Sequence, residues 1–176
     1  YLLDNYLSDI EVTKLKKCKN LELKKDFFKK KYREPIISDE AKSVLETADL
    51  IIYGPGTQHS SLFPSYLTKG VGEAISKNTE AEKVFIANTR MDYEIQGETM
   101  KSLCQKLHYY LNRKGSIKSP PEDLVTRYFF QDPAGLQKAG KDYLDLEFDS
   151  FAFPSRETLI TDWESDSGKH SGNRVL

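Results

Sequence analysis

A glycine turn rich in hydroxyl groups follows a short apolar run, and its composition suits the binding of an anion. The stretch reads ADLIIYGPGTQHSSLFPSYL and runs from residue 48 to residue 67. Gly54 and Gly56 lack Cβ atoms, so the backbone can take unusual angles and approach a ligand closely. Backbone N–H groups in such turns can bind phosphate oxygens. Hydroxyl donors follow at Thr57, Ser60 and Ser61. The turn therefore predicts an anionic, nucleotide-type ligand or, equally, a tight strand-to-helix connection without one.

A second polar group follows the next apolar run, KVFIA, at residues 83–87. Asn88 can bind a base or a sugar hydroxyl, and Arg90 can neutralise a phosphate; a simple turn is the alternative for Asn88. If both runs are neighbouring parallel strands, the two groups share the sheet edge where ligands bind in α/β proteins. The ligand site predicted in this way comprises Gly54, Pro55, Gly56, Thr57, His59, Ser60, Ser61, Asn88 and Arg90.

Two common nucleotide fingerprints do not fit the turn. The pattern G-x-G-x-x-G fails, because no glycine stands at His59 or Ser60, where the third one should be. The P-loop pattern G-x-x-x-x-G-K-[ST] is absent from the sequence. No Ser–His–Asp or Cys–His arrangement can be argued from spacing, so the catalytic residues are unknown.

The other candidate residues favour structural roles. His108 is expected on the surface of a helix. The acidic residues Asp162, Glu164 and Asp166 are expected in a solvated loop rather than around a metal ion, and no metal site is predicted. Trp163 is expected to dock the C-terminal tail on the core.

Alternating strands and helices must position these groups. Ser38 is a predicted N-cap, and the helix after it places Ala41, Val44, Leu45 and Ala48 on one face. The runs 50–53 and 83–87 read as parallel strands buried on both faces. Residues 124–130 form a third strand candidate. Helical stripes fall at Val71, Ala74 and Ile75, and at Met100, Leu103, Cys104, Leu107 and Leu111. This order predicts an α/β sandwich with a mostly parallel sheet.

A strongly basic stretch precedes this pattern. Ten of the twenty residues from Lys14 to Arg33 are Lys or Arg, and two are acidic. A solvated strand or hairpin, with LELKKDFF as the strand, is favoured over a nucleic-acid patch, because no regular aromatic spacing accompanies the charge. We expect no nucleic-acid partner.

Length and composition fit one α/β domain of 176 residues. No run approaches the length of a membrane helix, so no membrane partner is expected. Two cysteines without metal-site spacing favour a reduced, cytoplasmic setting.

The stretch from residue 48 to residue 75 resembles the CofD-like superfamily, whose pattern there is an apolar strand, GPGS, hydroxyl residues and a proline. KVFIANTRMDYEIQGET is similar to the family's next element, an apolar strand ending in Asn and then G-E-T. The specific match covers residues 38–111. DWESDSGKH is loosely similar to a family segment near the C-terminus, which implies that Lys169 and His170 reach the ligand. Three more residues separate Asn88 from Gly97 than in the family pattern.

The resemblance implies a Rossmann-like, three-layer fold and a nucleotide-bearing ligand. The YvcK-type gluconeogenesis factors of the superfamily imply a UDP-sugar-binding regulatory protein. The 2-phospho-L-lactate transferase branch implies instead transfer of a phospholactyl group from a guanosine diphosphate carrier to a deazaflavin, and Mg²⁺ is expected only in that case. A degenerate interaction module is the third interpretation. The family's GGGTG-like loop and Asp-rich segment are not in this sequence. We therefore expect a homo-oligomer or association with a missing N-terminal portion.

Overall fold

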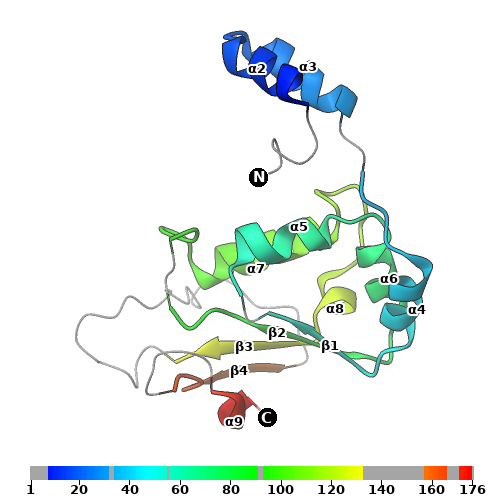
Figure 1. Cartoon of the computed structure of the whole chain (residues 1–176). Coiled ribbons are helices and arrows are strands. Elements are labelled where there is room, and N and C mark those ends of the chain that lie inside the picture. The colour runs from blue at the N-terminus through cyan, green and yellow to red at the C-terminus, as the bar shows by residue number, and fades with distance from the viewer. Residues whose placement is uncertain are drawn as a thin grey trace. The chain divides into compact units, whose positions relative to one another are not determined.

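The chain divides into two compact units, residues Tyr1–Glu34 and Pro35–Leu176, where the sequence predicts one domain. The computed structural model describes residues 8–31, 34–54, 56–90, 93–132, 157–165 and 171–175. Figure 1 draws both units with their elements labelled. Within the described residues, no helix is both long and apolar enough to cross a membrane.

The first unit contains two helices, α2 (Asp9–Lys17) and α3 (Leu21–Lys31), so the predicted strand at LELKKDFF is wrong. Ser8 and Glu11 form a capping box that begins α2. The Asn20 side chain accepts hydrogen bonds from the N–H groups of Glu22 and Leu23 at the start of α3. These local start signals, followed by Leu, Glu and Lys, favour a helix over a strand.

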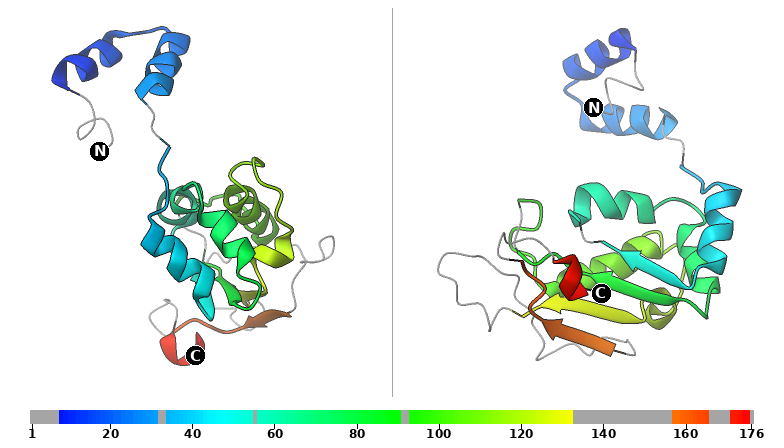
Figure 2. Two further views of the ribbon diagram at one scale, coloured as in Figure 1. Left: turned by 90° about the vertical axis from the view of Figure 1, so that its right-hand side faces the viewer. Right: turned by 60° about the horizontal axis from the view of Figure 1, so that its bottom comes forward.

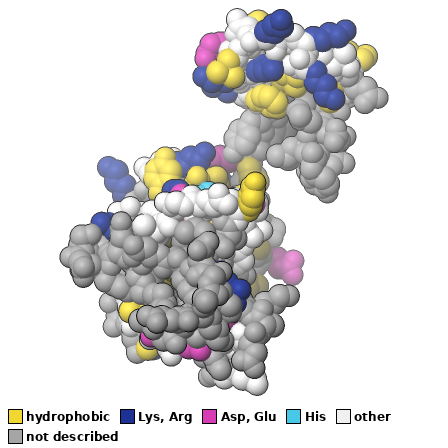
Figure 3. All heavy atoms as spheres, turned by 90° about the vertical axis from the view of Figure 1, so that its left-hand side faces the viewer, with side chains coloured by type: hydrophobic (Ala, Val, Ile, Leu, Met, Phe, Trp, Pro, Cys, Tyr) yellow, Lys and Arg dark blue, Asp and Glu magenta, His cyan; other side chains and the backbone are white. Residues whose placement is uncertain are grey.

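Lysines dominate the described surface of the first unit, and apolar side chains lie among them (Figure 3). Several large apolar side chains are more than 45% exposed, namely Ile10, Leu21, Leu23 and Phe28. Two short helices bury too little apolar surface to be stable alone in water. The exposed side chains therefore mark a surface that is incompletely covered in this structure.

The second unit is built on four parallel strands in the order β1-β2-β3-β4. They are β1 (Leu50–Tyr53), β2 (Glu82–Ile86), β3 (Arg127–Gln131) and β4 (Glu157–Thr161). The register pairs Tyr53 with Phe85 and Phe85 with Tyr128. The expected Rossmann-like α/β fold with a parallel sheet is therefore confirmed.

Helices connect the strands and cover the sheet. They are α4 (Asp39–Thr47), η1 (Gln58–Leu62), α5 (Phe63–Tyr66), α6 (Val71–Lys77), α7 (Met100–Leu111), α8 (Pro121–Leu124) and α9 (Gly172–Val175). In Figures 1 and 2, α5 and α7 lie over one face of the sheet, and α9 lies on the opposite side near β4. The five predicted apolar residues of α7 are all buried, as expected of its core-facing stripe.

Strands β1 and β2 differ in burial. Four of the five residues of β2 are buried, which confirms the predicted buried strand. Burial alternates along β1 instead: Ile51 and Tyr53 are buried, whereas Leu50 is 53% and Ile52 is 51% exposed. The prediction that β1 is buried on both faces is therefore wrong. Strand β1 lies at the edge of the described sheet, and one of its faces is open to solvent.

His108 is half-buried, contrary to the expected surface position. Its Nε2 atom is hydrogen-bonded to the hydroxyl of Tyr128 on β3. Burial lowers the pKa of His108 to about 4. The side chain therefore joins α7 to the sheet as a neutral imidazole at neutral pH.

Candidate ligand-binding site

The glycine turn begins where β1 ends and lies directly against the end of β2. Gly54 has a φ of +89°, and a Cβ on it would lie 2.8 Å from the carbonyl oxygen of Ile86. Only glycine fits this combination of left-handed backbone and close approach without strain. A Cβ on Gly56 would instead meet Leu62 at 3.8 Å, an ordinary contact. Gly54 therefore shapes the turn, whereas a side chain at position 56 would fit with ordinary contacts.

The residues after the turn form η1, a single turn of π-helix, a conformation often found at functional sites. Gln58 is fully buried at its start, and its Nε2 donates to the carbonyl oxygen of Gly56 at 3.3 Å. The Oε1 atom of Gln58 is buried without a hydrogen-bond partner among the described residues. A buried polar atom of this kind is uncommon and marks a place where a water or a ligand group would be stabilising.

The backbone of η1 already binds a negatively charged oxygen. The N–H of Ser60 donates to Oε2 of Glu94 at 2.9 Å. The two residues are 34 positions apart, so this contact ties the turn to the loop that follows β2. A backbone N–H that holds a carboxylate oxygen is equally suited to a phosphate oxygen.

A charged cluster lies beside η1. Lys106 on α7 forms an ion pair with Glu98, and its Nζ is 3.5 Å from Nε2 of His59. Ser102 also donates to Glu98. Burial would raise the pKa of Glu98, but hydrogen bonds from Lys106 and Ser102 and the positive charge nearby outweigh it, so this pKa lies below its usual value. Glu98 is therefore a carboxylate at neutral pH, and it holds Lys106 next to the turn.

The polar residues after β2 lie at the same edge of the sheet as the glycine turn, because β1 and β2 pair in parallel. Asn88 is half-buried there. Arg90 forms an ion pair with Glu164, whose side chain is 1% exposed. Glu164 is thus buried and paired, and the expectation of a solvated acidic loop is wrong for it.

Trp163 docks the segment after β4 on the sheet, as expected. Its ring stacks on Phe129 with centroids 5.1 Å apart, and its Nε1 donates to the carbonyl oxygen of Phe130 at 3.0 Å. Docking of Trp163 also positions the next residue, Glu164, to pair with Arg90 in the loop after β2. The C-terminal part of the chain therefore contributes to this edge of the sheet.

The structure thus brings several predicted site residues to one edge, but ligand binding there stays a prediction. Pro55, Lys169 and His170 lie outside the described residues. Four polar residues near the turn were not predicted: Gln58, Glu94, Glu98 and Lys106. The G-E-T motif was a signal for Glu98, whereas Lys106 looked like any solvated lysine of a helix.

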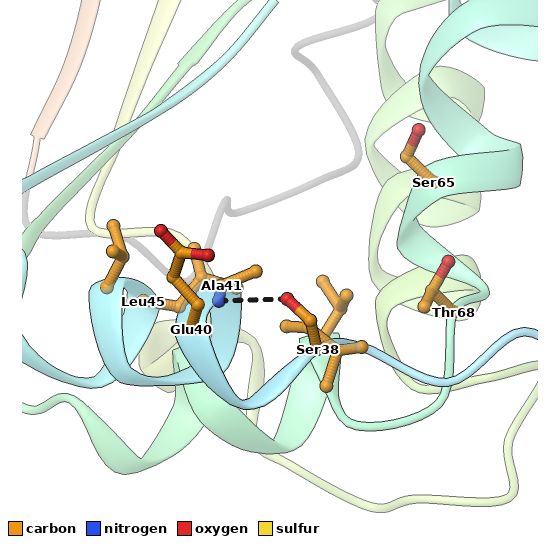
Figure 4. Close-up of a pocket in the computed structure, with 9 residues that line it drawn as sticks. Ser38, Glu40, Ala41, Leu45, Ser65 and Thr68 are labelled. Carbon is orange, nitrogen blue, oxygen red and sulfur yellow. Dashed lines mark hydrogen bonds between the residues drawn. The ribbon is translucent and has the colours of Figure 1, made fainter.

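A separate hollow of about 570 Å³ lies beside α4 and α5 (Figure 4). Ser38 caps α4 there through a hydrogen bond from the N–H of Ala41, and the hydroxyls of Ser65 and Thr68 belong to the opposite wall. Its lining is otherwise mostly apolar, with one carboxylate, Glu40, and no basic residue. None of the predicted site residues lines it, and its chemistry does not suit a phosphate.

A comparison of the sequence with family models shows the family to which the chain belongs. The family model described as "2-phospho-L-lactate transferase CofD" matches residues 6–133. The chain belongs to the CofD family. The match extends beyond the segment 38–111 on which the resemblance was based, and it includes both the glycine turn and the G-E-T motif.

Curated relatives within this CofD-like group carry the name of gluconeogenesis factors. The chain is 27% identical over 114 residues to a "Putative gluconeogenesis factor" of Thermotoga maritima, which covers 61% of this chain and 33% of the relative. It is 36% identical over 66 residues to a "Gluconeogenesis factor" of Halalkalibacterium halodurans, covering 38% of this chain and 20% of the relative. The chain therefore spans about a third or less of these relatives.

A solved structure has a similar fold. The crystal structure of a UPF0052-family protein from Bacillus halodurans superposes with a TM-score of 0.63 at 20% identity. The superposition covers 80% of this chain and 45% of that chain. At this identity the likeness concerns the fold alone.

Proposed function

We propose that the second unit binds the diphosphate of a nucleotide sugar, of the UDP-sugar type, and acts as a regulatory ligand-binding domain. The observation that carries this proposal is the hydrogen bond from the N–H of Ser60 to the carboxylate of Glu94. It indicates that the turn after β1 directs a backbone donor at an anionic oxygen. A diphosphate oxygen is likewise an anionic hydrogen-bond acceptor.

Three further features support the proposal. The turn lies beyond the carboxyl end of a parallel strand, where ligands bind in α/β folds. Oε1 of Gln58, an acceptor buried there without a partner among the described residues, could accept a hydrogen bond from a sugar hydroxyl of such a ligand. Relatives of the chain are named gluconeogenesis factors, which favours a regulatory role over catalysis.

A transferase is the second candidate, and the name of the matching family model favours it. Within the described residues, no group of three or more His, Cys, Asp or Glu side chains is placed to hold a metal ion. A Mg²⁺-dependent product from a lactate-bearing guanosine diphosphate donor would favour this candidate.

Thermal denaturation with UDP-sugars, GDP and inorganic pyrophosphate tests the proposal. A ligand present at about 100 times its dissociation constant stabilises the native state by about 2.7 kcal/mol and raises the melting temperature. We expect the largest increase with a UDP-sugar. A larger increase with GDP would favour the transferase, and no increase with any of the three would favour the non-catalytic interaction module.

A further inference from the structure

Two basic side chains lie at the edge of the sheet that carries the glycine turn, and they differ in how they are held. Arg90 donates a hydrogen bond from Nε to Oε1 of Glu164, and its Nη2 atom lies in ion-pair contact with the same oxygen but makes no hydrogen bond among the described residues. The Glu164 side chain is 1% exposed, so it pairs with Arg90 within the fold. Removing one member of a buried ion pair leaves an uncompensated charge, which is strongly destabilising. Arg90 is therefore held in place by the fold.

Lys106 is held more loosely. Its side chain is 37% exposed, and its ammonium group sits on a flexible four-carbon stem that can reorient. Its partner Glu98 also accepts a hydrogen bond from Ser102. Glu98 therefore keeps one hydrogen-bond donor when Lys106 turns away.

The side chain of Lys106 lies beside η1. Its Nζ lies 3.5 Å from Nε2 of His59, the residue that precedes Ser60. The Nδ1 atom of His59 is buried and has no hydrogen-bond partner among the described residues. A backbone donor that already holds a carboxylate, a ring nitrogen without a partner among the described residues and a partly exposed cation therefore lie together at η1.

We propose that Lys106, and not Arg90, is the cation that neutralises the anionic group of the ligand at the glycine turn. This inference rests on the proposed diphosphate site and names a residue that the sequence did not indicate. Lys106 leaves Glu98 and moves to the ligand, while Arg90 positions the segment after β4 through Glu164.

Titration calorimetry at low salt with UDP, GDP and inorganic pyrophosphate tests the assignment, since these probes share the diphosphate group. We expect Lys106→Met to weaken binding at least tenfold and Lys106→Arg to restore most of it. Lys77→Met is the matched control, because Lys77 is an exposed lysine of the same unit that also pairs with a glutamate, Glu46. This control should change affinity less than twofold.

The Arg90 assignment is tested with the double variant Arg90→Met, Glu164→Met, which leaves no buried unpaired charge. It should lose less affinity than Lys106→Met. If the wild type binds none of the three probes, both the proposed function and this inference fail. If the wild type binds but Lys106→Met binds equally well, or the double variant loses more, this inference alone is overturned.

Discussion

Gly54 and Ile86 approach each other so closely that a Cβ on residue 54 would lie 2.8 Å from the carbonyl oxygen of Ile86. The contact joins the ends of β1 and β2 at the edge that carries the candidate site. Gly54→Ala should therefore destabilise the unit by about 2–4 kcal/mol, from backbone strain and from displacement of the β2 end.

Gly115→Ala is a suitable control in urea unfolding. Gly115 has a similar positive φ of +81°, but a Cβ there would meet no atom within 4 Å. The Gly115→Ala variant should lose only about 1 kcal/mol of unfolding free energy, because only the left-handed backbone conformation opposes the substitution. Equal losses in the two variants would show that the approach to Ile86 does not constrain the turn.

Gly56→Val should leave the fold intact and abolish diphosphate binding. The space beside Gly56 accepts a Cβ with ordinary contacts, so stability in urea should change little. The branched side chain would occupy the room through which a phosphate reaches the backbone N–H groups. Calorimetry with a UDP-sugar measures the effect, and undiminished affinity would mean that the glycine at 56 serves only the turn.

Glu94→Ala should strengthen the binding of inorganic pyrophosphate severalfold. The Glu94 carboxylate occupies the N–H of Ser60, so it competes with an incoming anion and repels it. Glu80→Ala, which removes an exposed glutamate elsewhere on the same unit, is the control and should have no effect. Weaker binding in Glu94→Ala would indicate that Glu94 orders the turn rather than competing with the ligand.

His108 should make the second unit less stable in mild acid. Its pKa is about 4 in the folded protein, because burial disfavours the charged ring, and about 6.5 when unfolded. Between these values the unfolded chain binds more protons, so stability is complete above about pH 6.5 and falls as pH decreases toward 4. From pH 7.5 to pH 5 the loss due to His108 should be about 2 kcal/mol.

Urea unfolding of the His108→Gln variant at pH 7.5 and at pH 5 measures how much of the loss of stability is due to His108. Glutamine can still hydrogen-bond to the Tyr128 hydroxyl, but it does not titrate. The variant should lose about 2 kcal/mol less than the wild type between the two pH values. An identical pH dependence in both proteins would exclude His108 as the titrating group.

The open face of β1 should cause self-association of the chain when it is prepared alone. Leu50 and Ile52 are half-exposed apolar side chains on a strand that has one neighbour in the described sheet. Exposed apolar edge strands pair readily with other chains. Light scattering should show species larger than a monomer, and Ile52→Lys should reduce them. A monodisperse wild-type monomer would contradict this expectation.

The sequence predicted the central part of the fold because local patterns determine it. The apolar stripe of α7 has a clear helical period, and the runs that become β1 and β2 are short and continuously apolar, as is typical of strands. Alternating Leu-Glu-Leu in α3 resembled a strand, although the caps at Ser8 and Asn20 favoured helices. Strand β4 was missed because ETLIT contains only two apolar residues, and the strand is defined by its pairing with β3, which is distant in the sequence.

Only those parts of the candidate site that come directly after a strand in the sequence were predicted. The glycine turn and Asn88 could be placed at strand ends, but the pairing of Arg90 with Glu164 spans 74 residues and has no local signature. Gly72 makes another contact that could not be predicted from the sequence. A Cβ there would lie 2.0 Å from the carbonyl oxygen of Leu111, a contact between α6 and the end of α7 that no local pattern reveals.

The stacking of Trp163 on Phe129 gives the molecule a built-in optical reporter. The chain contains a single tryptophan, and it lies in the second unit, next in sequence to the glutamate that pairs with Arg90. Its emission therefore follows the docking of the segment after β4, whereas the two lysine-rich helices, which have no indole, contribute nothing to that signal. Fluorescence and far-ultraviolet circular dichroism would consequently separate the melting of the sheet from that of the first unit within a single sample.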